Sequence, residues 1–382
     1  MTGPLPGDVP LSLYVHIPWC LRKCPYCDFN SHALKGDLPE AAYVQALLAD
    51  VDADARKLSG REVQTVFIGG GTPSLFSGEA IGNLLAGIRS RLSLAEDAEI
   101  TLEANPGAVD AGHFAAYREA GVNRLSIGVQ SFSATKLEAL GRVHDPRQAR
   151  EAFHVARRAG FGNINLDLMF GLPDQCLDEV LEDLSQALAL APEHLSWYQL
   201  TLEPNTLFHH QPPAVPGDGV LWEMQQAGQA LLAQQGYVQY EVSGYARKGF
   251  QCRHNLNYWR FGDYLGAGAG AHGKLTGDGA VRRYWRERQP QAYMEAGGAV
   301  VAAEHELDES DRRLEFMMNA LRLKQGVPLS LYGDMTGLSP DGLRAALSRA
   351  RTRGLLTEAG DRLQATSLGQ RFLNDLLVMF HE

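Results

Sequence analysis

Three cysteines near the start of the chain have a spacing that suits metal chemistry. Cys20, Cys24 and Cys27 follow one another as C-x3-C-x2-C in the segment LYVHIPWCLRKCPYCDF, directly after a strand-like apolar run. A zinc site usually needs a second pair of ligands about a dozen or more residues away, and no such pair follows. Three thiolates on one short loop instead suit three irons of a [4Fe-4S] cluster and leave the fourth iron open to a chelating ligand. A disulfide or a buried thiol group is the alternative, but three neighbouring cysteines cannot all pair.

The segments that must position this loop alternate between strand-like and helical patterns. Six apolar runs read as strands: Leu13–Pro18, Thr65–Gly71, Glu99–Pro106, Arg124–Ser131, Asn163–Pro173 and His194–Pro204. Helical patterns follow them at Glu40–Leu58, Glu79–Leu92, Asp110–Ala120, Arg147–Ala159, Leu177–Leu190 and Val220–Gln235. This alternation predicts an α/β fold with a parallel sheet, either doubly wound or closed into a barrel. In both architectures ligands bind at the carboxyl ends of the strands.

Polar residues and glycines stand at those strand ends. The run Gly69-Gly70-Gly71-Thr72-Pro73 ends the second strand, where it would let the backbone approach a ligand with free amide and carbonyl groups. An ordinary turn is the alternative. Glu103, Gln130 and Asp167 close the next three strands. Each alone reads as a satisfied polar residue, whereas all of them at one end of successive strands predict a shared ligand.

The cysteine motif and the strand-end residues resemble the radical S-adenosylmethionine superfamily, and most of the chain resembles its coproporphyrinogen dehydrogenase-like branch. The resemblance implies an incomplete six-stranded (β/α) barrel. It also implies that the open iron of the cluster is chelated by S-adenosylmethionine, which the reduced cluster cleaves to a 5'-deoxyadenosyl radical in that superfamily. By matching motifs in order and spacing, it assigns the cofactor site to Tyr14, Tyr26, Gly70, Gly71, Thr72, Glu103, Gln130, Arg142 and Asp167. Whether this chain cleaves the cofactor is left open.

Two departures separate the chain from the coproporphyrinogen III dehydrogenases of that branch. Asp28-Phe29 stands where those enzymes have a further cysteine. Those enzymes also carry an N-terminal arm ahead of the cluster strand, whereas only 13 residues precede Tyr14 here. An H-N-x-x-Y-W motif, His254 to Trp259, is instead similar to that of haem chaperones in the same branch. It implies binding of haem and its transfer to haem-accepting proteins, with respiratory and membrane-bound proteins among the acceptors to consider. Oxygen-independent dehydrogenation of coproporphyrinogen III is the alternative function.

The motif also offers haem ligands on chemical grounds. His254 is a sensible axial ligand, and Tyr258 and Trp259 offer flat apolar surface to a porphyrin. Asn255 is placed to orient the imidazole, and Cys252 is an alternative thiolate. The competing interpretation makes His254 a hydrogen-bonded core histidine.

The remaining sequence predicts a second, smaller module. We expect a barrel over residues 1–240, the H-N-x-x-Y-W segment and a connecting region over 241–304, and a winged-helix-like domain over 305–382. Within the connecting region we expect a glycine-rich loop that covers the cofactor, Asp263–Leu275, followed by a linker over 276–304. The predicted third helix of the last domain carries Arg344, Arg349, Arg351 and Arg353, so a DNA-binding regulator with a sensory cluster is a further alternative.

Composition argues against that alternative and indicates a compartment. The chain has 382 residues, with 35 basic and 45 acidic side chains and a net charge of −10, which does not favour nucleic acid as a partner. Five cysteines form no secreted disulfide framework. The N-terminal segment MTGPLPGDVP lacks the features of a signal peptide, and no run reaches the ~18 apolar residues of a membrane helix. We therefore expect a cytoplasmic protein.

Overall fold

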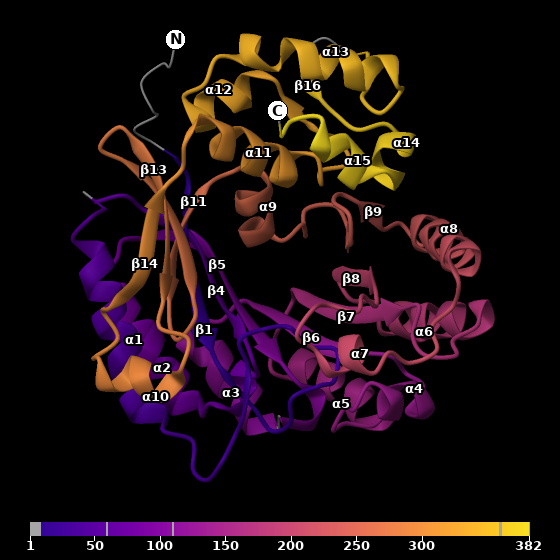
Figure 1. Cartoon of the computed structure of the whole chain (residues 1–382). Helices are drawn as coiled ribbons and strands as arrows, with labels where there is room; N and C mark the ends of the chain where they lie inside the picture. The colour runs from indigo at the N-terminus through magenta and orange to yellow at the C-terminus, as the bar shows by residue number, and fades with distance from the viewer. Residues whose placement is uncertain (1–8, 59, 109–110, 359–360, 382) are drawn as a thin grey trace.

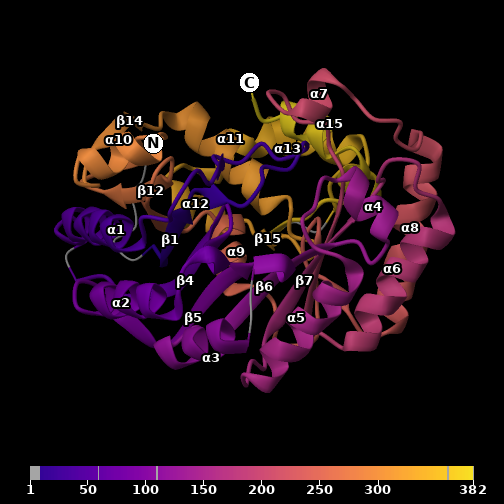
Figure 2. The same ribbon diagram turned by 90° about the horizontal axis from the view of Figure 1, so that it is seen from below.

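The computed structural model describes residues 9–58, 60–108, 111–358 and 361–381. Its centre is six parallel strands in the order β1-β4-β5-β6-β7-β8. They are β1 (Leu11–Ile17), β4 (Val63–Gly70), β5 (Leu94–Ala104), β6 (Arg124–Gln130), β7 (Ile164–Phe170) and β8 (His194–Gln199). The sheet curves, and the helices after its strands cover its outer face (Figure 2). This is the α/β fold with an incomplete (β/α)6 barrel that the sequence predicted, and all six strands are confirmed.

The outer helices also match their predictions closely. They are α1 (Glu40–Ala55), α2 (Gly78–Arg89), α3 (Ala111–Ala120), α5 (Pro146–Arg158), α6 (Leu177–Leu190) and α8 (Asp218–Gln234). Shorter elements lie between them: β2 (Trp19–Cys20), β3 (His32–Ala33), η1 (Pro73–Leu75), η2 (Pro106–Ala108), α4 (Ala134–Ala139) and α7 (Leu207–His210). The helices and the sheet share one apolar core, which includes Leu13 and Leu47.

Alternation along the strands separates the core from the site. In β1, Leu13 and Val15 are fully buried in the apolar core, while the intervening Tyr14 and His16 belong to the opposite face of the strand. Successive side chains of a strand point to opposite faces, so an apolar outer face comes with a polar face inside the barrel. The side chains predicted to bind ligands are therefore directed to the interior by the same pattern that packs the core.

The sheet continues beyond β1 in a way that the sequence did not reveal. β11 (Asp263–Ala267) pairs in parallel with β1, and the antiparallel strands β12 (His272–Gly277), β13 (Ala280–Arg286) and β14 (Val301–Glu306) extend the edge. The prediction of a covering loop and a plain linker here was wrong. Glycine-rich segments such as His272–Gly277 have low strand propensity, and pairing with the barrel edge overrides it. At the opposite edge, β9 (Val238–Gln239) and β10 (Gly244–Ala246) follow β8.

A buried ion cluster fixes this extension to the barrel. Arg286 of β13 forms ion pairs with Asp50 and Asp54 of α1, and all three side chains are at most 2% exposed. Tyr284 donates to Asp54 at 2.8 Å, and Tyr293 of α10 (Pro290–Glu295) donates to Asp50 at 2.8 Å. Burial raises the pKa of Asp50 to about 7, although Arg286 opposes the shift. The strands β12 and β13 are thus attached through charges that have no access to water.

A winged-helix-like unit forms the C-terminal part of the chain and has its own apolar core. It contains α11 (Glu309–Ala320), β15 (Val327–Pro328), α12 (Ser330–Thr336), η3 (Pro340–Leu343), α13 (Arg344–Thr352), β16 (Arg362–Leu363), α14 (Ser367–Arg371) and α15 (Leu373–Val378). Figure 1 shows it above the barrel, with α9 (Arg253–Trp259) between the two. Leu256 and Trp259 of α9 pack against its core. The boundaries expected at residues 240 and 304 stay a prediction. In the described part of the chain, no helix combines the length and apolar character needed to cross a membrane.

Candidate functional site

The three motif cysteines lie on one loop held between two short strands. Cys20 ends β2, which pairs in parallel with β3, and the intervening turn carries Cys24 and Cys27. The amide of Cys27 donates to the carbonyl of Cys24 at 3.1 Å, which makes the turn compact. All three thiols are free and partly buried. Burial raises the pKa of the Cys20 and Cys27 thiols.

The cysteines open into a cavity of about 330 Å³ at the carboxyl ends of the strands. Eight of the predicted cofactor residues line it together with them: Tyr26, Gly70, Gly71, Thr72, Glu103, Gln130, Arg142 and Asp167. Within the described residues, no group of three or more His, Cys, Asp or Glu side chains is placed to hold a single metal ion. The structure thus gathers residues from the cluster loop, β4, β5, β6, β7 and the segment before α5 around one space.

Two carboxyl groups give the floor of this cavity its electrostatic character. Burial raises the pKa of Glu103 to about 8, and the neighbouring Asp167 adds to the shift. Burial also raises the pKa of Asp167, although Ser126 and Asn165 donate to its carboxylate at 3.0 and 2.8 Å. A donor that reaches such a carboxyl stabilises its charged form, so a ligand hydroxyl or ammonium group is a suitable partner for it.

The glycine run has a different role from the one expected of it. The amide of Gly70 donates to Glu103 at 3.0 Å, that of Gly71 to the Ile17 carbonyl at 2.7 Å, and that of Thr72 to the Trp19 carbonyl at 2.7 Å. The expectation of free amides was therefore wrong for Gly70, Gly71 and Thr72. Gly70 has φ +113°, and a Cβ there would lie 2.5 Å from the His16 ring. The glycines let this segment pack against β1 and the cluster loop.

Arg142 connects the cluster loop with the barrel. Its Nη2 donates to the Gly128 carbonyl at 2.8 Å and its Nη1 to the Cys24 sulfur at 3.8 Å. The buried Nε has no hydrogen-bond partner among the described residues, so it is available to a ligand in the cavity. Gln130 has φ +67° and accepts a hydrogen bond from Tyr198 at 2.9 Å. Strained backbone at a non-glycine residue is concentrated at ligand sites.

The sequence analysis missed several polar residues of the same cavity. Ser126 and Ser196 line it from β6 and β8, and Tyr198 stands next to Gln130. Their position at the inward face of the strands was the available signal, since the neighbouring Leu125, Ile127 and Leu195 are fully buried in the core. Period-two alternation would have found them.

Tyr14 lies apart from this group and faces a second, larger cavity. That cavity has a volume of about 700 Å³ and also contacts Phe29, Gly70 and Glu103, which line the first cavity as well. The Tyr14 hydroxyl is 3.0 Å from Nδ1 of His16, whose Nε2 is 2.8 Å from the Asn30 carbonyl. The two cavities are therefore neighbours that share a wall at the end of β4 and β5.

His254 lies inside the protein between the barrel and α9. Its side chain is 1% exposed, with Nδ1 2.7 Å from the Thr65 hydroxyl and Nε2 3.0 Å from the Tyr258 hydroxyl. Burial lowers its pKa to about 3. Thr65 and Tyr258, rather than Asn255 as expected, hold the ring. Iron coordination by His254 stays a prediction, and it requires one ring nitrogen to give up its hydrogen bond.

Cys252 has a comparable internal position at the start of α9. It is buried, and its sulfur donates to Glu99 at 3.6 Å. Burial raises its pKa to about 12, which opposes the thiolate form that a metal ligand requires. The Glu99 carboxylate also accepts from the amide of His254 at 3.1 Å and so caps this end of α9.

The partial barrel with three cysteines and strand-end polar residues at one cavity defines the radical S-adenosylmethionine class. Residues 14–187 match the radical SAM superfamily, and residues 307–372 match the HemN C-terminal domain. The solved structure of coproporphyrinogen III oxidase (HemN) from Escherichia coli has a similar fold, with a TM-score of 0.82 at 24% identity. The similarity covers 98% of this chain and 91% of that structure.

Full-length relatives assign the chain to a narrower family. The chain is 55% identical to the heme chaperone HemW of Escherichia coli (strain K12), over 97% of this chain and 98% of that protein. It is 48% identical to the heme chaperone HemW of Haemophilus influenzae, over 98% of this chain and 99% of that protein. The chain belongs to the HemW family within the radical S-adenosylmethionine superfamily.

Proposed function

We propose that this chain is a haem chaperone that binds haem and transfers it to acceptor proteins. The relationship to HemW over nearly the whole chain is the observation that carries this proposal. The larger cavity, which Tyr14 faces beside the cysteine cavity, supports the proposal. Tyr258 and Trp259 also line it, and a flat apolar ligand fits such an aromatic lining. Respiratory and membrane-bound haem proteins are the acceptors that we would test first, in a cytoplasmic setting that keeps the thiols reduced.

The cysteine cavity is the proposed site of a [4Fe-4S] cluster with S-adenosylmethionine. Cys20, Cys24 and Cys27 would hold three irons, and the unpartnered Arg142 Nε is available to an anionic group close to them. When bound, the cluster supplies one-electron chemistry. Glu103 and Asp167 would accept bonds from cofactor donors, and Tyr26, Gln130 and the glycine segment would enclose it.

Dehydrogenation of coproporphyrinogen III is not favoured as the function. The similarity to the coproporphyrinogen III oxidase structure is at 24% identity and concerns the fold. Asp28-Phe29 stands where the resemblance places a further cysteine in that enzyme group. Full-length relatives at 55% and 48% identity are haem chaperones.

A divided anaerobic sample tests both functions. The cluster is reconstituted in the full chain, and one portion is titrated with haem and followed by absorbance. The other portion receives coproporphyrinogen III, S-adenosylmethionine and a reductant, and its products are separated by chromatography. We expect saturable haem binding at one equivalent, transfer to an apo-haem protein, and no decarboxylated product. Protoporphyrinogen formation, or no saturable haem binding, would contradict the proposal.

A further inference from the structure

The 700 Å³ cavity lies between the barrel edge, the cluster loop and α9. Its walls are rich in aromatic rings, among them Tyr14 from β1, Tyr258 and Trp259 from α9, Tyr264 from β11 and Trp285 from β13. Tyr258 and Tyr264 meet edge to face with ring centroids 4.5 Å apart. Phe29 of the cluster loop, 59% exposed, lines it too. This lining suits a flat, apolar ligand of tetrapyrrole size.

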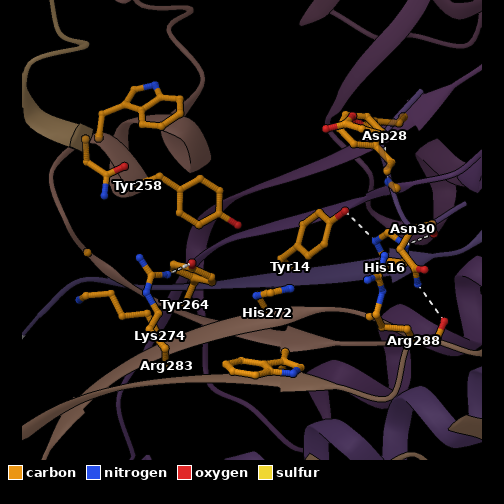
Figure 3. A pocket seen from close by; sticks show the side chains of 18 of the residues that line it. Tyr14, His16, Asp28, Asn30, Tyr258, Tyr264, His272, Lys274, Arg283 and Arg288 are labelled. Carbon is orange, nitrogen blue, oxygen red and sulfur yellow. Dashed lines mark hydrogen bonds between the residues drawn. The ribbon is translucent and has the colours of Figure 1, made fainter. Parts of the chain in front are cut away.

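His272 is the histidine of this cavity whose ring is free to bind iron. It begins β12, is exposed, and faces the cavity close to Tyr14 (Figure 3). Among the described residues its ring nitrogens have no hydrogen-bond partner, whereas both ring nitrogens of His16 are engaged. Trp285 stacks on the ring at 5.9 Å with an interplanar angle of 24°, which limits its orientation.

The charged groups of the cavity differ in their availability. Lys274 pairs with Asp263 at 2.9 Å, and Arg283 pairs with Glu315 through its Nε at 2.9 Å. Arg288 is exposed, and its guanidinium has no acidic partner in the described part of the chain. Its backbone is fixed, because Asn30 donates to its carbonyl at 2.9 Å. Arg288 is therefore the cation here that can receive a carboxylate from a ligand.

We propose that the cavity binds an iron tetrapyrrole, with the His272 imidazole coordinating the iron and Arg288 pairing with a propionate. The inference rests on the proposed chaperone function and specifies its haem site. Coordination exchanges an iron-bound water for the neutral imidazole and involves no redox step. His254 then acts as a positioning residue, because it bonds the hydroxyl of Tyr258 in the cavity wall.

This placement also relates haem to the proposed cofactor site. Phe29, Gly70 and Glu103 line both cavities, so a tetrapyrrole in the larger one would lie directly beside the cluster loop. A ligand in either cavity would therefore contact residues that also line the other cavity.

Ligand rescue tests the assignment in the full chain. We expect His272→Gly to change the Soret band of ferric haem and to remove the histidine signature from its electron paramagnetic resonance spectrum. Affinity should fall at least about tenfold, since loss of outer-shell partners alone commonly lowers metal affinity about 10- to 100-fold. Added imidazole should restore the wild-type spectrum. The matched control is His305→Gly, because His305 also contacts Trp285, at 5.8 Å, but does not line the cavity.

A second variant tests the propionate contact. Arg288→Gln should weaken binding of haem up to about fivefold, as expected for an exposed ion pair, and leave binding of the haem dimethyl ester unchanged. Equal effects on haem and its ester would contradict the pairing. An intact circular dichroism spectrum and normal cluster absorbance establish that each variant is folded.

The outcomes separate this inference from the function on which it rests. If the wild-type chain binds no haem, the chaperone proposal fails and the site assignment with it. If the wild-type chain binds haem and His272→Gly keeps its spectrum and affinity, the assignment is overturned while the function stands. Loss of histidine ligation in His254→Asn, with retention in His272→Gly, would move the ligand to α9.

Discussion

Removing Arg286 should loosen the edge of the sheet that carries the proposed haem ligand. The variant Arg286→Met keeps an unbranched apolar stem and deletes the guanidinium that pairs with Asp50 and Asp54, at 2.5 Å in the case of Asp54. Those carboxyls are 0% and 2% exposed, so the variant leaves Asp50 without a cation and Asp54 with only the half-exposed Lys57, 3.0 Å away.

The expected loss of stability at this edge of the sheet follows from the burial of the two carboxyls. Breaking a buried pair by removing one partner costs about 3–5 kcal/mol, because the remaining charge is desolvated and uncompensated. At about 1.36 kcal/mol per factor of ten, this corresponds to a fall of about 10²- to 10⁴-fold in the protection of β12 and β13 amides from hydrogen exchange. The loss should shrink as the pH falls, because protonation removes the buried charge from Asp50, whose pKa burial raises to about 7 even beside Arg286.

Hydrogen exchange read by mass spectrometry measures the protection of these amides directly. Peptides from β12 and β13 are compared with peptides from β6. The matched control is Arg282→Met on the same strand, whose contacts with Glu304 and Glu306 are 3.7 and 3.8 Å long and exposed. Such a surface pair is worth about 0–1 kcal/mol, so protection should change little. Adding Asp50→Asn and Asp54→Asn to the Arg286 variant should restore most of the protection. A change below about threefold in Arg286→Met, or equal losses in both single variants, would refute the reasoning.

Three further predictions concern the cluster cavity. Alanine at all three motif cysteines should abolish the iron-sulfur absorbance after reconstitution, and a normal cluster spectrum would move the site elsewhere. Gly70→Ala should weaken S-adenosylmethionine binding at least about tenfold in calorimetry, because the new Cβ would meet the His16 ring at 2.5 Å. Gly160→Ala, at φ +86° with nothing within 4 Å, is the control for backbone strain alone. Burial raises the folded-state pKa of Glu103 from 4.5 to about 8, so the folded chain holds a proton that the unfolded chain releases in that range. The contribution of Glu103 to the free energy of unfolding should therefore fall as the pH rises from about 5 to about 8. In urea titrations, Glu103→Gln should flatten the slope of this free energy against pH. An identical slope in the variant would contradict the raised pKa.

Local sequence patterns sufficed for the parallel sheet and for the polar residues at its strand ends, whereas the family resemblance was needed to choose a barrel and to complete the set of cofactor residues. Six apolar runs alternate with amphipathic helices, and this periodicity determines a parallel sheet because only that arrangement buries both faces of such strands. The strand-end positions of Glu103, Gln130 and Asp167 then required no long-range information, since parallel strands present their carboxyl ends at one edge. The C-x3-C-x2-C spacing was equally local, and these residues do share one cavity.

Tertiary structure alone decided the edge strands and the environment of each histidine. β11 pairs with β1 across more than 240 residues of sequence, through register Leu11↔Asp263, and its glycine-rich sequence carries no strand signal of its own. The H-N-x-x-Y-W motif named His254 as a haem ligand. One of its hydrogen bonds goes to Tyr258, one helical turn away in the same motif, but its burial and its bond to Thr65 of β4 depend on the fold. His272 stood in a segment without a recognisable motif, and the pairing of β12 with β13 places it beside Trp285 in the aromatic cavity. Residue types and spacings thus determined which chemistry the chain can hold, whereas long-range packing determined which side chains are free to perform it.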